Sequence, residues 1–167
     1  MNAFIPTFIA VLLAEYGGRA MLFSRLPRLS LAATMLGLAV GIAAFGGISL
    51  GPTMNAHARA LMLGIALILT GFGQFGKAPS GDPPATVAGT LLFVWRSSAP
   101  FLAFAFSIWA GAPVGAAAGA LAGIAAAVAL AAAPLSPRVV LIVRRLCGAT
   151  MTVIGIYAAL WALRLIA

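Results

Sequence analysis

The stretch Ala14-Glu15-Tyr16-Gly17-Gly18-Arg19-Ala20 decides how the rest of this chain is interpreted. It places one of only two acidic residues inside a long apolar segment. An ionised carboxylate at bilayer depth is costly, so such a residue usually faces a protein interior, a partner charge or an aqueous path. Arg19 follows Glu15 at the i,i+4 spacing that brings two side chains onto one helical face. The two glycines between them weaken the helix and let another backbone approach closely.

The composition is that of a membrane protein. The chain is 63% hydrophobic and 7% charged, with a mean hydropathy of +1.15, which ordinary soluble domains do not tolerate. We expect one integral membrane domain over residues 1–167, in contact with the lipid bilayer. The net charge of +8 comes from arginines scattered between apolar runs, so topology explains it better than nucleic-acid binding. Cys147 is the only cysteine, which excludes an intrachain disulfide and cysteine-pair metal motifs.

Apolar runs long enough to cross a hydrocarbon core of about 30 Å as helices recur along the whole chain. The predicted fold class is an all-α membrane protein with six transmembrane helices. Pro100 predicts a kink in the fourth of them. The six segments lie at about Ala3–Phe23, Ser30–Leu50, Ala58–Phe75, Ala85–Ala110, Val114–Ala133 and Val139–Ile166.

A polar linker at about 77–84, rich in glycine and proline, divides the chain into repeats of about 1–76 and 85–167. Three helices in each half would make the two repeats inverted in the membrane. Leu12–Ala20 overlays Leu91–Ala99 without gaps, and two glycine pairs share one spacing: Gly64 with Gly71, and Gly148 with Gly155. Inverted repeats with interrupted helices indicate a transporter site at the bilayer midplane. Chance alignment of two apolar segments is the alternative.

The basic residues predict the orientation, because cytoplasmic loops are enriched in lysine and arginine. One side of the predicted topology carries seven of them: Arg19, Arg25, Arg28, Lys77, Arg138, Arg144 and Arg145. The other side carries Arg59 and Arg164, and Arg96 falls inside the fourth segment. We therefore expect both termini outside the cytoplasm, in a bacterial inner membrane.

Glycines spaced four residues apart predict close helix packing, because small residues let backbones approach in lipid. Packing between helices of the same chain is favoured, and a homodimer interface is the alternative. The positions are Gly37 and Gly41, and Gly111, Gly115, Gly119 and Gly123.

The motif at Glu15 resembles that of the Golgi- and thylakoid-type manganese/calcium–proton exchangers, within the lysine-exporter superfamily. The resemblance implies two three-helix repeats, each opening with Glu-x-Gly-Asp-(Lys/Arg)-(Ser/Thr). Glu15, Gly17 and Arg19 match the first copy, whereas Gly18 replaces the aspartate and Ala20 the hydroxyl residue.

The second copy departs further from the family pattern. Only the aromatic Trp95 fits, while Val94, Arg96, Ser97 and Ser98 replace the acid, the glycine, the second acid and the basic residue. The family is implied to bind a divalent cation between four carboxylates, of which this chain keeps one. Divalent hard cations prefer several anionic oxygen ligands, so we expect a doubly charged ion to be rejected.

We therefore predict a transport site formed by two groups of residues. The first is the proton-coupling group Glu15, Gly17, Gly18 and Arg19, and the second is Trp95, Arg96, Ser97 and Ser98. Glu15 is the only candidate metal ligand at depth, and we expect an ion pair between Glu15 and Arg96. Gln74 is interpreted as a helix cap.

Three functions stay open. The first is a secondary transporter of an ion or small metabolite that resembles cation–proton antiporters. The second is a non-transporting scaffold or partner subunit, in which the charges of Glu15 and Arg96 are purely structural. The third is an exporter of a small anionic or zwitterionic metabolite. No nucleophile–base arrangement and no phosphate-binding loop is visible in the sequence, so an enzyme is not expected, nor is a cofactor.

Overall fold

The computed structural model describes residues 2–16, 20–23, 25–76, 86–131 and 136–165. Every regular element among them is helical. The elements are α1 (Phe4–Glu15), α2 (Ala20–Phe23), α3 (Leu29–Leu50), the 3₁₀ turn η1 (Gly51–Thr53), α4 (Ala56–Gly73), α5 (Val87–Trp95), α6 (Ser98–Ala110), α7 (Pro113–Ala131) and α8 (Pro137–Ala162).

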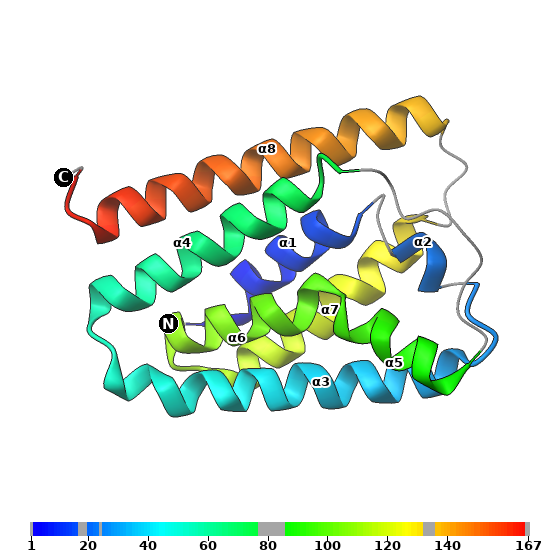
Figure 1. Cartoon of the computed structure of the whole chain (residues 1–167), viewed down its shortest axis with the longest axis horizontal. Helices are drawn as coiled ribbons and strands as arrows, with labels where there is room; N and C mark the ends of the chain where they lie inside the picture. The colour runs from blue at the N-terminus through cyan, green and yellow to red at the C-terminus, as the bar shows by residue number, and fades with distance from the viewer. Residues whose placement is uncertain (1, 17–19, 24, 77–85, 132–135, 166–167) are drawn as a thin grey trace.

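The helices form one bundle with three principal contacts: α4 runs along α8, α1 lies against α7, and α3 lies against α6. Figure 1 shows α8 and α4 along one side of the bundle and α3 along the opposite edge, with the others between them. The start of α1 and the end of α8 lie toward the same end of the bundle (Figure 1).

In the described part of the chain, four helices are long and apolar enough to cross a membrane: α3 with η1, α4, α7 and α8. The bent pair α5 and α6 makes a fifth if it counts as one span. The chain is therefore an integral membrane protein. With 12 residues, α1 is about 18 Å long, too short to cross a membrane alone.

The bend in the fourth predicted segment does not arise at Pro100. The helix axis turns by 42° between α5 and α6, at Arg96 and Ser97. Ser97 has an extended backbone, and its hydroxyl caps α6 by accepting a hydrogen bond from the Ala99 amide. Pro100 lies in the first turn of α6, where the missing N–H of proline costs little. The kink predicted at Pro100 is wrong because a serine cap restarts the helix before it.

Glycines form the contact between α1 and α7. A Cβ atom at Gly123 would lie 2.8 Å from the Phe8 carbonyl oxygen, and one at Gly119 would meet the carbonyl oxygen of Phe4. A Cβ atom at Gly115 would lie 3.4 Å from the amide nitrogen of Phe4. Because this face of α7 carries no side chains at its glycines, the backbone of α1 packs directly against it.

The other glycines with this spacing behave differently. Gly111 ends α6 in a left-handed conformation, with φ of +64°, so it is a turn glycine rather than a packing one. At Gly37 and Gly41 a Cβ would meet no described atom within 4 Å. The predicted packing of Gly37 and Gly41 is thus wrong within the described chain, because α3 buries another face. That face carries Ala32, Leu36, Val40, Ala44 and Gly47.

The contact between α4 and α8 also rests on glycines, which pair reciprocally. A Cβ at Gly64 would lie 2.8 Å from the Gly155 carbonyl oxygen, and one at Gly155 would lie 2.7 Å from that of Gly64. Gly71 and Gly148 face each other in the same way, at 2.7 and 2.8 Å. Since the earlier glycine of one helix meets the later glycine of the other, the two helices are antiparallel.

Candidate functional site

Glu15 is the last residue of α1 and is 3% exposed. Its Oε1 atom accepts three hydrogen bonds: from the Ser97 hydroxyl at 2.8 Å, the Ser98 hydroxyl at 2.6 Å and the Ser98 amide at 2.9 Å. The carboxylate of the first predicted site group thus meets two serines of the second group across 82 residues of sequence.

The helix break explains why these donors are free. The first amides of a helix have no partner inside the helix, and Ser98 is the first residue of α6. Glu15 takes that amide, while the hydroxyl of Ser97 accepts from Ala99 and donates to Glu15. The N-terminus of a helix also carries partial positive charge, which complements a carboxylate. α6 therefore holds Glu15 by geometry and by electrostatics.

The two oxygens of Glu15 differ. All three hydrogen bonds reach Oε1, and Oε2 accepts none from the described residues. Glu15 as a whole is 3% exposed. A carboxylate held through one oxygen can still present the other to a proton or a cation.

A second network fixes the end of α1 itself. The Gln74 side-chain amide donates to the Ala14 carbonyl oxygen, one of the carbonyls that the end of α1 leaves unpaired. The oxygen of the same side chain accepts from Nε of Arg144 at 3.0 Å, and Nη2 of Arg144 donates to the Gly73 carbonyl at 3.3 Å. The chain Arg144–Gln74–Ala14 therefore positions the residue that precedes Glu15.

This network was not foreseen. Gln74 does cap its own helix, as the C-cap residue of α4, and in addition its side chain reaches α1. Arg144 was counted with the basic loops, whereas it is 3% exposed. A signal for Arg144 exists in the sequence: it lies four residues before Gly148 on the face that α8 buries. Gly148 leaves the room that Gln74 occupies, since a Cβ there would lie 2.7 Å from Cβ of Gln74.

The predicted site also includes Arg96, which ends α5. It is exposed, and Glu15 has no ion pair with it in the described ranges, where the contacts of Glu15 are those to Ser97 and Ser98. The predicted Glu15–Arg96 contact is wrong, because Arg96 ends α5 just before the serine cap and its side chain does not turn inward. Gly17, Gly18 and Arg19 lie outside the described residues.

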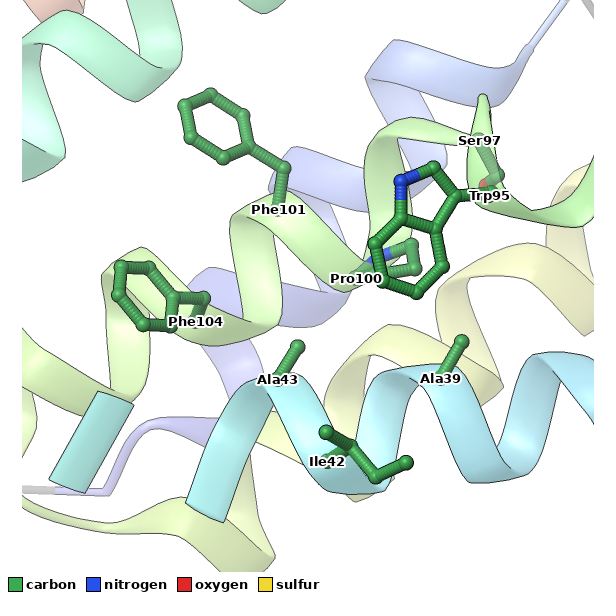
Figure 2. Close-up of a pocket in the computed structure, with 8 residues that line it drawn as sticks. All are labelled: Ala39, Ile42, Ala43, Trp95, Ser97, Pro100, Phe101 and Phe104. Atoms are coloured by element: carbon green, nitrogen blue, oxygen red, sulfur yellow. The ribbon is translucent and has the colours of Figure 1, made fainter. Parts of the chain in front are cut away.

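A groove of about 280 Å³ opens beside the site, between α3 and the α5–α6 bend. Figure 2 shows Ala39, Ile42 and Ala43 of α3 on one side and Pro100, Phe101 and Phe104 of α6 on the other. Trp95 and Ser97 lie together at one end (Figure 2). Trp95 is 74% exposed. The groove is thus apolar apart from Ser97.

A carboxylate with hydroxyl and amide donors makes a poor metal site. Over the described ranges, no group of three or more His, Cys, Asp or Glu side chains is close enough to hold a metal ion. The neighbours of Glu15 present hydrogen-bond donors, whereas a hard divalent cation needs several oxygen ligands, preferably anionic.

The comparisons with known proteins add no name to this site. No family model matches the chain, and neither a curated protein nor a solved structure matches it.

Proposed function

We propose that this protein is a proton-coupled secondary transporter in which Glu15 carries the exchanged proton. The observation that carries the proposal is the set of three hydrogen bonds joining Glu15, at the end of α1, to the first residues of α6. A buried ionisable residue in a membrane protein marks a functional site by default. Interrupted helices that meet at such a residue are typical of transporter binding sites.

The proposal includes six spans arranged as two inverted repeats, 1–76 and 85–167, with α1 and α2 forming the first span. The positions of the interruptions support it. α1 ends at Glu15 and α5 at Trp95, while the ungapped overlay aligns Glu15 with Val94. The reciprocal glycine contacts of antiparallel α4 and α8 are also what an inverted pair of third helices requires.

From the resemblance to manganese/calcium–proton exchangers, the proposal adopts the helix arrangement but not the divalent cation as substrate. One carboxylate offers one negative charge, and no second acid is available at depth, because Asp82 in the linker is the only other one. Two unit charges about 4 Å apart interact by about 4 kcal/mol even at an effective dielectric constant of about 20. A divalent ion at Glu15 would therefore keep a costly uncompensated charge.

A purely structural role is the second candidate, because Oε1 is already satisfied by three donors. In that case Glu15 would lock α1 to α6 and exchange nothing. The two candidates differ in what an isosteric change does. Glu15→Gln keeps an acceptor oxygen for the serines but cannot release a proton, so it separates transport from folding.

The test is proton movement across proteoliposomes that contain a pH-sensitive dye. Mn²⁺, Ca²⁺ and monovalent organic cations are added outside in turn, to wild type, Glu15→Gln and the control Asp82→Asn. Asp82→Asn is matched, since it also turns one acid into its amide and changes the net charge equally. We expect at least one cation to drive proton flux in wild type and Asp82→Asn but not in Glu15→Gln. Equal flux in all three proteins, or none with any cation, contradicts the proposal.

Intact cells that express tagged protein test the orientation that the basic loops predict. If both termini lie outside the cytoplasm, impermeant reagents should modify a tag at either end of the chain on intact cells. Modification only after the membrane is opened would reverse that orientation.

A further inference from the structure

The groove beside Glu15 has a composition that restricts what it can bind. Its lining includes Ala39, Ile42 and Ala43 on α3, and Phe101 and Phe104 on α6. Its volume of about 280 Å³ is close to the lower limit for small-molecule pockets, about 300 Å³. The groove is therefore suited to one compact apolar group, of about the size of a single substituted aromatic ring.

Ser97 joins this groove to the carboxylate. It lines the groove, and its hydroxyl donates to Oε1 of Glu15 at 2.8 Å. A ligand in the groove therefore lies one hydrogen bond away from the only buried acid of the described residues. Glu15 itself does not line the groove, so the positive end of a ligand would have to reach the carboxylate past Ser97.

The charge of the ligand follows from that of the site. Glu15 provides one negative charge, and its hydrogen-bond partners Ser97 and Ser98 provide none. Arg96, between Trp95 and Ser97 in the sequence, is exposed and does not line the groove. A singly charged cation is compensated by this site, whereas a divalent ion is not. The buried cation Arg144 is held elsewhere, by Gln74 and the Gly73 carbonyl between α4 and α8, and does not line the groove.

The aromatic residues add a second reason for a cation. The indole of Trp95 lies at the same end of the groove as Ser97 (Figure 2). Trp is the most favourable aromatic partner for an organic ammonium group, and Phe contributes less. An apolar body would be received by Phe101 and Phe104, while the charged end would lie between Trp95 and Ser97.

We propose that the substrate is a singly charged organic cation with a compact apolar body, which enters the groove from the hydrocarbon side between α3 and α6. Its positive end replaces the proton of Glu15: the O–H bond breaks, the proton passes to water, and the carboxylate pairs with the cation. One proton is released for each cation bound, and nothing is oxidised or reduced. The inference rests on the proposed function and specifies the substrate class of the same site.

Benzyltrimethylammonium is the probe, because it carries a fixed charge, one aromatic ring and no proton of its own. Protons released into a weakly buffered suspension of the full-length purified protein are counted as the probe is added. We expect saturable release from wild type and none from Glu15→Gln. Tetramethylammonium, with the same charge and no ring, should need at least about ten-fold more to reach half of that release, because it buries no apolar body.

A groove-filling variant tests the place of binding. Ala43→Phe puts a ring into the groove, and overpacking of this kind should raise the half-saturating probe concentration about ten-fold or more. Ala33→Phe is the matched control, since Ala33 is an exposed alanine of the same helix that does not line the groove. It should leave the titration unchanged.

The outcomes separate this inference from the proposed function. Glu15-dependent proton release with Mn²⁺ or Ca²⁺, but not with benzyltrimethylammonium, overturns the organic cation and leaves proton coupling by Glu15 in place. Release by the probe that Ala43→Phe does not weaken overturns the groove as its site. No Glu15-dependent release with any cation overturns both proposals.

Discussion

The end of α1 and the start of α6 meet at one place, and each supplies the hydrogen-bonding groups that the other lacks. Where α1 stops, a carbonyl and a carboxylate need donors; Gln74 supplies one to Ala14, and the serines supply three to Glu15. Where α6 starts, an amide and two hydroxyls need an acceptor, and Glu15 supplies it. Each break would be unfavourable alone in a membrane, where water does not satisfy backbone groups. Their juxtaposition makes both tolerable and creates the candidate site.

The two breaks also differ in what fixes them. The end of α1 depends on other helices: α7 seats its backbone on glycines, and α4 holds its final turn through Gln74. The start of α6 depends on its own sequence, because Ser97 caps it locally. Mutations that remove donors from α6 should therefore affect the carboxylate directly, whereas mutations around α1 should act by moving it.

The largest effect on stability is expected from removing both hydroxyls. Ser97→Ala/Ser98→Ala leaves the buried carboxylate with the Ser98 amide alone. Hydrogen bonds to charged groups contribute about 1.5–3 kcal/mol each, so the double variant should lose about 3 kcal/mol or more. The measurement is the free energy of unfolding from SDS titration in mixed micelles.

Two controls accompany that variant. Ser49→Ala removes an exposed hydroxyl that bonds only the Phe45 carbonyl of its own helix, and should change the stability by less than about 0.5 kcal/mol. Repeating the serine changes in Glu15→Gln should cost less than in wild type. If the cost is equal in both backgrounds, the hydroxyls do not act through Glu15.

Next in size is the contact of α1 with α7. Gly119→Ala places a methyl group against the Phe4 carbonyl, and overpacking should cost about 2 kcal/mol. Gly37→Ala is the matched change, since no described atom lies within 4 Å of the added Cβ. Alanine favours a helix over glycine, so it should be neutral or stabilising by up to about 1 kcal/mol. The same unfolding assay compares them, and a reversed order would refute the assigned packing faces.

An effect of similar size is expected at Gln74. Gln74→Leu removes the donor to Ala14 and the acceptor of Arg144, at a cost of about 1–3 kcal/mol for buried groups left unpaired. Because the end of α1 would lose its position, proton release on cation binding should also weaken. Thr150→Val, which removes only an exposed bond within α8, is the control. Unchanged proton release in Gln74→Leu would show that this network does not position Glu15.

The smallest effect is expected at Arg96. Arg96→Gln changes an exposed side chain and should shift the stability by less than about 0.5 kcal/mol, with proton release unchanged. Arg144→Gln, a matched change at a buried arginine, should cost several times more. Equal losses from the two arginines would restore the original assignment of Arg96 to the site.

Much of the architecture could be predicted from the sequence because hydropathy and helix length decide it. The segment predicted at Ser30–Leu50 is observed as Leu29–Leu50, and the burial of Glu15 follows from its place in a long apolar segment. Which face of a helix turns inward is harder. Arg96 and Arg144 both lie in or beside apolar segments of the sequence. In the structure Arg96, at the helix break before the Ser97 cap, is exposed, whereas Arg144 is buried. The contacts of Gln74 could not be predicted either, since they join residues 60 and 70 positions apart.

The measurement that tests the central claim most directly is the number of protons released per chain on cation binding, in wild type and Glu15→Gln. About one proton per chain is expected from wild type, because one carboxylate meets one charge, and none from the variant, which should still fold. Equal release from both proteins, or no release from a folded wild type with any cation, would contradict the claim that Glu15 exchanges a proton at the junction of α1 and α6.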